Sequence, residues 1–214
     1  MTSQAGTATV PPSDYRLLLP EGWFRVHIEP QQRVRSVEAL VNRQFEGTDS
    51  APHIKQRLRQ ELLTQAEAAY EEGGIELYIS LQRAGALTVP ASLLVSLVPP
   101  LPGGSVPTVS NLASRYSENV DADVSEVELP AGTALRVRRS TGEPGHPAPM
   151  GAAGSSAEAL PSVTVSYQMP VPGTGGHLLL TFSSPLVRIA DAMTELFDAV
   201  AGSLTWVGGD GSHE

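Results

Sequence analysis

The sequence predicts an α+β fold, in which helices pack against an antiparallel sheet of about seven strands. Segments with alternating apolar and polar residues come in neighbouring pairs joined by Gly- or Pro-rich stretches, which is typical of β-hairpins. Segments with apolar residues at three- and four-residue steps come in blocks and do not alternate regularly with the strands. The 214 residues include no cysteine, so the core must form by apolar burial alone, which a chain of this length can supply.

The N-terminal end predicts disorder followed by one strand. Residues 1–13 are rich in Thr, Ser, Ala and Pro and lack the apolar content that a packed core requires. Pro20-Glu21-Gly22 is a turn signal. The strand predicted after it, residues 23–28, alternates apolar residues with Arg25 and His27, so we expect His27 to face solvent.

Two helices are predicted next, at residues 30–45 and 52–72. In both, apolar residues recur at helical spacing, and Arg and Gln fill the opposite face. Pro30 is expected to begin the first helix and Gly47 to end it, and Gly73-Gly74 is expected to end the second. We expect the two helices to pack on the sheet as an antiparallel pair.

Four strands are predicted in the middle of the chain, and a short helix at residues 111–117. The strands are residues 75–82, 92–98, 125–129 and 135–138. The second of them is apolar on both faces, which favours a central position covered from both sides. Residues 83–90 are expected to be the connection that leads into it. In the last two strands we expect Glu126 and Glu128 to pair across the strands with Arg136 and Arg138.

The last quarter of the chain predicts a hairpin and an amphipathic helix. Strands at residues 163–169 and 178–182 flank a loop rich in Gly and Pro. Ser183 or Ser184, followed by Pro185, is expected to begin the helix and Gly202 to end it. The apolar stripe expected to pack on the hairpin consists of Leu186, Ile189, Met193, Leu196, Phe197 and Val200. The acidic residues of the helix are expected to form a solvated face.

These elements predict a single domain over residues 14–207. Residues 140–161 are low in apolar content and rich in Gly, Pro, Ala and Ser, so they are expected to be a flexible insertion or surface loop. The tail at residues 208–214 is expected to be loose.

Composition excludes several classes of function. The net charge is −9 and only one lysine is present, which is a poor basis for binding nucleic acid. No run of 18 apolar residues is present, so no membrane span is predicted, and a soluble cytoplasmic protein is expected. The absence of cysteine excludes disulfides, thiol catalysis and thiolate metal sites. No cofactor is predicted.

No catalytic or metal-binding residues are predicted, and four residues stand out only as candidates for binding. His177 ends a Gly-rich loop, which is a position where binding residues are often found. That loop lacks the features of a phosphate-binding loop, because it precedes a strand and has no Gly-Lys-Ser/Thr ending. Arg136, Arg138 and Arg139 form a basic cluster that could grip an anion or an acidic partner. A solvated or structural role is the alternative for all four.

The order of elements resembles the PsbP-like fold group. The resemblance lies in Leu19-Pro20-Glu21-Gly22-Trp23, which enters the first strand, in the middle hairpins, and in the last hairpin with its helix, residues 178–206. That group includes an extrinsic photosystem subunit, a Ran-binding nuclear import factor and small envelope lipoproteins of actinobacteria. The chain departs from it in having two long helices at residues 31–72 and in lacking the lipid-bearing cysteine and export signal of the lipoproteins. The resemblance implies a binding or assembly module and identifies no functional residue.

The function predicted from the sequence is a non-enzymatic protein-interaction module, acting as adaptor, chaperone or assembly factor for another protein. Two alternatives remain open. One is a small hydrolase that uses His177 with a Ser or Asp brought close by the fold. The other is a small-ligand carrier, because a curved sheet capped by helices can enclose a cavity.

Overall fold

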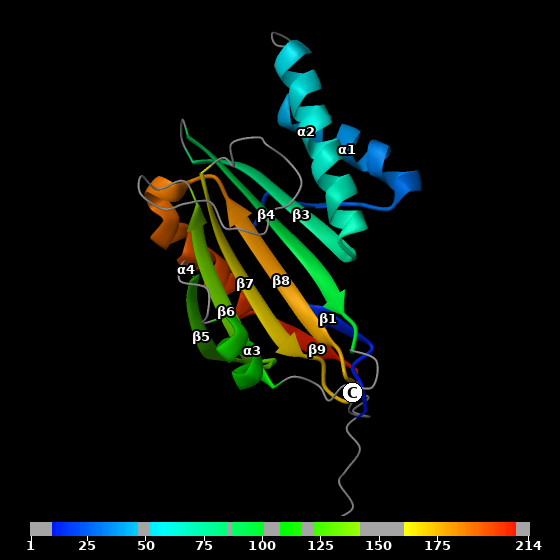
Figure 1. Ribbon diagram of the computed structural model, residues 1–214. Helices are drawn as coiled ribbons and strands as arrows, with labels where there is room; N and C mark the ends of the chain where they lie inside the picture. The colour runs from blue at the N-terminus through cyan, green and yellow to red at the C-terminus, as the bar shows by residue number, and fades with distance from the viewer. Residues whose placement is uncertain are drawn as a thin grey trace, which may run out of the picture.

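A computed structural model describes residues 10–46, 52–84, 87–100, 108–116, 122–141 and 161–208. The predicted α+β class is confirmed, because four helices pack against a seven-stranded antiparallel sheet (Figure 1). The strand order is β2-β3-β4-β8-β7-β6-β5, so the last hairpin of the chain lies in the middle of the sheet. The two edge strands of that sheet are therefore β2 and β5.

Each of the seven predicted strands corresponds to a strand of this sheet. They are β2 (Trp23–Val26), β3 (Gly74–Ala84), β4 (Leu87–Val98), β5 (Ala122–Leu129), β6 (Gly132–Thr141), β7 (Ser162–Pro170) and β8 (His177–Ser184). The prediction of a connection at residues 83–90 is wrong, because β3 continues to Ala84 and β4 begins at Leu87. Pro90 lies opposite Leu81 in this ladder, and its carbonyl accepts a hydrogen bond from the Ser184 hydroxyl.

Helices α1 (Pro30–Gln44) and α2 (Pro52–Glu71) cover one face of the sheet over β2, β3 and β4. Two ion pairs between the helices, Arg33–Glu67 and Glu38–Arg59, show that they are antiparallel, as predicted. The predicted stop at Gly47 lies outside the described residues. Gly73 follows α2 with a φ of 79°, the left-handed conformation that favours glycine at a helix end.

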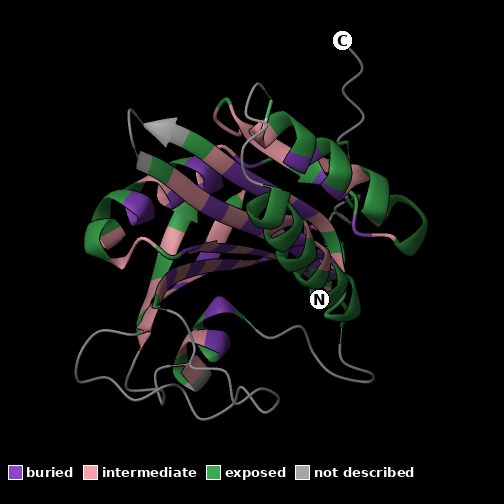
Figure 2. Ribbon diagram, turned by 90° about the horizontal axis from the view of Figure 1, so that it is seen from above, coloured by how far each residue is buried: buried purple, intermediate pink, exposed green. Residues whose placement is uncertain are grey.

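Helix α4 (Ala190–Ala201) packs on the opposite face of the sheet. Leu93 of β4 belongs to the core cluster under α4, whereas the next residue, Leu94, contacts the cluster under α1 and α2. Successive side chains of a strand point to opposite faces, so the two clusters lie on opposite sides of the sheet. Helix α3 (Val109–Tyr116) packs on Leu135 and Val137 near the other edge of the sheet. Figure 2 shows buried residues concentrated along the strands between these layers and on the helix sides that face them. The ring of Phe197 stacks on Phe182, with centroids 5.0 Å apart.

The predicted start of the last helix is wrong. Ser184 is the final residue of β8, and a single turn, η1 (Val187–Ile189), precedes α4. The Ser184 hydroxyl accepts a hydrogen bond from the amide of Leu186 but donates across the sheet to Pro90. Thr194 is buried and donates to the carbonyl of Ala190, so the packed side of α4 includes a satisfied polar residue. Ile189, expected to pack, is instead 40% exposed.

Strands β1 (Asp14–Arg16) and β9 (Thr205–Val207) form a separate two-stranded sheet that the sequence does not predict. Asp14 lies opposite Val207, so the two ends of the described chain lie side by side. The partly buried side chains of Tyr15 and Trp206 pack against the α4 core cluster. Three-residue strands show no alternation long enough to detect, and their pairing joins opposite ends of the sequence.

The predicted disorder at residues 1–13, the flexible insertion at residues 140–161 and the loose tail lie mostly outside the described residues. Within them, Ser140 and Thr141 belong to β6. Ser13 donates its backbone amide to the carbonyl of Val207. The single-domain boundary at residues 14–207 stays a prediction.

Candidate functional site

Arg136 and Arg138 pair with acidic residues of α4, and Arg136 also lies 3.8 Å from Asp123 on β5. The register places Glu126 opposite Leu135 and Glu128 opposite Thr133, so the predicted glutamate–arginine pairs are wrong. Arg136 instead donates to both carboxylate oxygens of Asp198, at 2.8 and 3.3 Å. Acidic residues expected to be solvated on α4 therefore neutralise the strand arginines.

Asp198 also accepts a hydrogen bond from the hydroxyl of Tyr167 on β7. Burial and this hydrogen bond to Asp198 raise the pKa of Tyr167 above its ordinary value. For Arg136, burial lowers the pKa, but the hydrogen bonds and electrostatic attraction of Asp198 and Tyr167 together outweigh burial, so the net shift is upward. Arg136, Tyr167 and Asp198 form a hydrogen-bonded network that joins β6, β7 and α4. The side chain of Arg136 is only 13% exposed.

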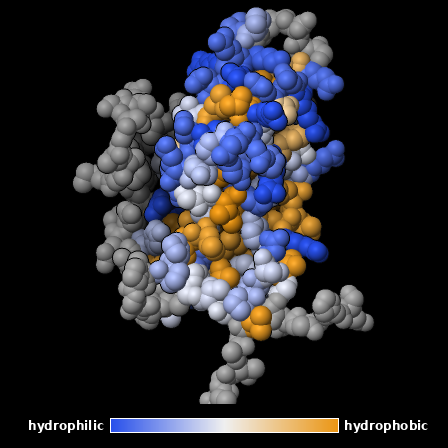
Figure 3. Space-filling view, turned by 90° about the vertical axis from the view of Figure 1, so that its right-hand side faces the viewer, coloured by the Kyte–Doolittle hydropathy of each residue, from blue (hydrophilic) through white to orange (hydrophobic). Residues whose placement is uncertain are grey.

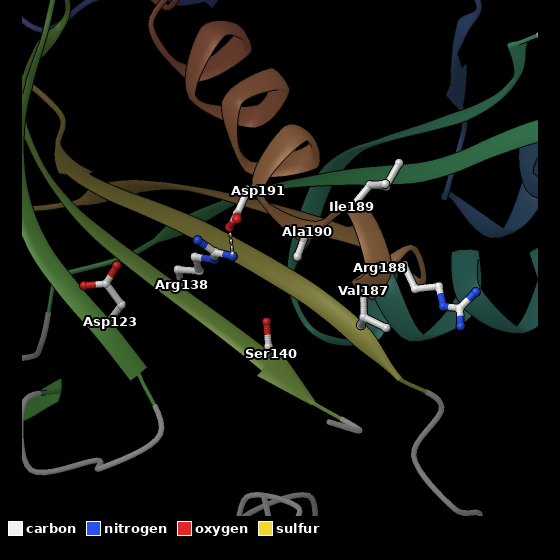
Figure 4. A pocket seen from close by; sticks show the side chains of 8 residues that line it. All are labelled: Asp123, Arg138, Ser140, Val187, Arg188, Ile189, Ala190 and Asp191. Carbon is white, nitrogen blue, oxygen red and sulfur yellow. Dashed lines mark hydrogen bonds and ion pairs between the residues drawn. The ribbon is translucent and has the colours of Figure 1, made fainter. Parts of the chain in front are cut away.

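Arg138 and Arg139 lie at different surfaces. Figure 4 shows Arg138 reaching Asp191 at the start of α4, an ion pair of 2.6 Å beside an open hollow of about 500 Å³. In the same view Arg188 points away from this pair. Arg139 is on the opposite face, where its guanidinium lies 5.6 Å from the ring centroid of Tyr116. The arrangement separates Arg139 from Arg136 and Arg138, and a binding role for any of the three stays a prediction.

His177 is the first residue of β8 and is only 3% exposed. It lies between Val98 and Pro170 in the ladder. A substrate in solution would reach this imidazole only after local opening of the sheet. The loop before it forms one wall of an apolar depression described below, and a binding role for His177 stays a prediction.

We call this depression the apolar hollow; its volume is about 460 Å³ and it lies where the sheet meets the β1–β9 pair. Its lining residues are Pro12, Ser13, Asp14, Tyr15, Ile75, Leu97, Pro99, Pro100, Val171, Thr174, Gly175, Gly176, Leu178 and Trp206. Leu97 is 51% exposed and Ile75 42% exposed, so the walls stand open to solvent. Figure 3 shows hydrophobic residues gathered below the hydrophilic helices on this side of the molecule.

Local geometry explains why the apolar strand residues Ile75 and Leu97 remain exposed to solvent. The β3–β4 register shifts between Gly74 and Glu76, so Ile75 falls at an irregularity of the ladder. A Cβ at Gly74 would lie 2.6 Å from the carbonyl oxygen of Ala69, so only glycine permits this close approach to the end of α2. Pro99 follows β4 immediately and cannot donate to a ladder, which leaves Leu97 near the open end of the strand.

The other walls of the hollow are held by hydrogen bonds. The indole of Trp206 donates to the carbonyl of Ala131 at 2.8 Å. In the β7–β8 loop, the Thr174 hydroxyl donates to the carbonyl of Val171 and accepts from the amide of Gly176. These bonds satisfy polar groups at the wall, which leaves mainly carbon atoms facing the space.

A second hydrogen-bonded network lies beside the hollow and is centred on Glu76. Its carboxylate accepts hydrogen bonds from the hydroxyls of Tyr15 and Tyr78 and pairs with Arg25 at 2.8 Å. Burial and the Glu76 carboxylate raise the pKa of Tyr78 to about 12. The pKa of Tyr15 is raised by burial and by its hydrogen bond to Glu76. These interactions of Glu76 connect β1 and β2 to β3 and hold Tyr15 at the wall of the hollow.

The sequence pattern did not single out Ile75 and Leu97, because both were assigned to core strands. A usable signal for Leu97 is that the apolar run at residues 92–98 ends directly at two prolines. In the described part of the chain, no group of three or more His, Asp and Glu side chains is arranged to hold a metal ion. The described helices include none with the length and apolar content needed to cross a membrane.

Comparisons with known proteins assign no family. No protein-family model matches the chain, and neither does any curated protein sequence. Among solved structures, the chain is similar to LpqN of Mycobacterium tuberculosis, a protein involved in cell envelope biogenesis. The identity is 10% and the TM-score 0.45, over 95% of this chain and 88% of that one. The resemblance to the PsbP-like group stays a prediction.

Proposed function

We propose that this protein is a non-enzymatic protein-interaction module that takes apolar side chains of a partner protein into the apolar hollow. The observation that supports this is the half-exposed state of Leu97 and Ile75 in its walls. Burying a leucine side chain completely contributes about 1.5–3 kcal/mol, so covering the exposed half of Leu97 would contribute roughly 1 kcal/mol. The proposed compartment is the cytoplasm.

A small-ligand carrier is the second candidate, because about 460 Å³ is within the size range of ligand pockets. A carrier must cover most of the surface of its ligand, whereas Leu97 and Ile75 in the walls of this hollow are about half exposed. A partner protein would supply the missing cover itself. The buried position of His177 favours both candidates over a hydrolase that uses this residue.

The test is a quantitative affinity capture from host lysate with immobilised wild-type protein and two variants. Leu97→Lys places a charge in the hollow, and Ile54→Lys is the matched control, because Ile54 on α2 is 50% exposed and does not line the hollow. We expect one stoichiometric partner to bind the wild type and Ile54→Lys equally and to bind Leu97→Lys at least about tenfold more weakly.

Circular dichroism of each variant confirms that the fold is intact before capture. A partner retained equally by Leu97→Lys would contradict the role of the hollow. Titration with an apolar fluorescent probe separates the two candidates. Saturable binding of the probe at one site, together with no captured protein, would favour the carrier.

A further inference from the structure

A second hollow, of about 530 Å³, lies between the edge strand β2 and helix α1; we call it the strand-edge groove. It is lined by Phe24, Arg25, His27, Gln31, Gln32, Arg35, Ser36, Ala39, Leu40 and Arg43. None of these residues lines the apolar hollow. The groove is therefore a separate surface, formed by a strand on one side and a helix on the other.

The charge of the groove is opposite to that of the whole chain. Three arginines and one histidine line it and no aspartate or glutamate does, although the net charge of the chain is −9. Within the described residues, Arg35 and Arg43 have no carboxylate at ion-pair distance; the Arg43 guanidinium lies 4.3 Å from the ring centroid of Phe24. Arg25 pairs with Glu76, but its side chain is still 52% exposed. The groove thus offers positive charge that the described part of the chain does not neutralise.

The backbone of β2 offers hydrogen-bonding groups to the same space. β2 pairs with β3 on one side only and forms the edge of the sheet. The amide of His27, just after the strand, points toward α1 and donates to the Ser36 hydroxyl at 3.0 Å. Because backbone groups of an extended chain alternate in direction, the amide and carbonyl of Arg25 point to that side as well. An extended ligand could therefore pair with this edge.

The row of α1 residues that lines the groove is about as long as a short extended peptide segment. Gln31, Arg35, Ala39 and Arg43 recur every four residues, so they form one row along α1. Twelve residues of helix rise about 18 Å, which corresponds to roughly five residues of extended chain at about 3.3 Å each. The apolar side chains of Phe24 and Leu40 complete the lining, so a ligand needs both acidic and apolar residues.

We propose that the strand-edge groove binds an acidic, extended segment of a partner protein, which adds to the sheet as a strand beside β2. The carboxylates of the segment pair with Arg35 and Arg43, and its backbone pairs with the edge at Arg25. Strand addition beside a helix is a recurring mode of peptide recognition, in which the backbone provides affinity and side-chain contacts provide specificity. Nucleic acids and lipid headgroups share the negative charge but cannot extend a β-ladder, so the free edge favours a peptide.

Fluorescence anisotropy with a labelled ten-residue peptide of alternating Glu and Val tests this proposal. Arg35→Glu and Arg43→Glu are the test variants, and both positions are exposed on α1, so the fold should tolerate them. Arg188→Glu is the matched control, since Arg188 is exposed, lies outside the groove and has no ion pair in the described structure. We expect each test variant to weaken binding about tenfold and the control to stay within about twofold of the wild type.

Two further probes separate strand addition from attraction of charge alone. The same peptide with N-methyl groups at alternate residues keeps its charge but cannot form a ladder, so we expect it to bind about tenfold more weakly. A Lys–Val peptide should show no binding. Leu97→Lys should leave Glu–Val binding unchanged, which keeps this result independent of the proposed function.

Three results would overturn the proposal. Equal binding of the N-methylated peptide would exclude strand addition. Equal effects of Arg188→Glu and Arg35→Glu would show general attraction with no site in the groove. Binding of a single-stranded oligonucleotide or of phosphatidylglycerol vesicles that is lost on Arg35→Glu, with no binding of the acidic peptide, would assign the groove to another class of ligand.

Discussion

Asp198 and Asp191 both join α4 to an arginine of β6. Replacing each by asparagine compares the loss of a partly buried ion pair with the loss of an exposed one. Asp198 accepts from Arg136 and Tyr167, and its side chain is 44% exposed, whereas that of Asp191 is 88% exposed. The substitution keeps the shape of each side chain and removes its charge. Asp198→Asn therefore leaves the guanidinium of Arg136, which is 13% exposed, without its main counter-charge.

The two substitutions should lower the free energy of unfolding by different amounts, because solvent screens the Arg138–Asp191 pair more than the Arg136–Asp198 pair. Breaking a fully buried ion pair costs about 3–5 kcal/mol, and the partial exposure of Asp198 reduces this to about 2 kcal/mol. The Arg138–Asp191 pair is nearly a surface pair, for which about 0.5 kcal/mol is typical. In a domain of this size 1 kcal/mol shifts the melting temperature by about 2–4 °C. We therefore expect a fall of roughly 4–8 °C for Asp198→Asn and about 1–2 °C for Asp191→Asn.

Urea unfolding followed by tryptophan fluorescence and by far-ultraviolet circular dichroism measures both free energies, and coincidence of the two probes tests the two-state assumption. Tyr167→Phe, alone and combined with Asp198→Asn, completes a double-mutant cycle. We expect a coupling energy of about 1 kcal/mol, because each single variant removes the hydrogen bond between the hydroxyl of Tyr167 and the charged carboxylate of Asp198. Equal losses for Asp198→Asn and Asp191→Asn would refute the reasoning from burial.

Two other properties of the chain are open to measurement. Gly73→Ala should lower the free energy of unfolding by about 1 kcal/mol through conformation alone, because φ is 79° and a Cβ would meet no atom within 4 Å. A calorimetric scan that shows no loss would contradict this assignment. In alkali, the phenols of Tyr15, Tyr78 and Tyr167 hold their protons more tightly in the folded state than in the unfolded state. Their contribution to stability should thus be constant below the ordinary pKa of 10.0 and be lost as the pH rises toward the Tyr78 value of about 12, with a smaller loss in Tyr78→Phe. A urea midpoint that does not change between about pH 10 and pH 12 would disprove the shift.

The parts of the fold that the sequence predicted are those encoded by local pattern. Alternation over seven residues from Val163 to Met169 was sufficient to identify β7, and helical spacing identified α1, α2 and α4. The start of α4 was mistaken because the hydroxyl of Ser184 is engaged by Pro90, which is distant in the sequence. A local cap signal carries no information about such a partner.

The site depends on pairings that local pattern does not contain. The partners of Arg136 and Arg138 lie on α4, more than fifty residues away in the sequence, at 62 and 53 positions. One wall of the apolar hollow exists only because β1 pairs with β9. The edge position of β2 likewise follows from the strand order of the whole sheet and not from residues 23–26.

The pairing of β1 with β9 also determines how the molecule responds to a pulling force. In this ladder Asp14 and Val207 are the paired residues nearest to the two ends of the described chain. Tension applied to both ends would separate the ladder one residue pair at a time, which requires far less force than shearing all the pairs together. Tyr15 and Trp206 form the second pair to separate, and both line the apolar hollow. The part of the fold with least mechanical resistance is thus a wall of the proposed binding surface, and tethering the protein by both ends would open this wall while the seven-stranded sheet remained intact.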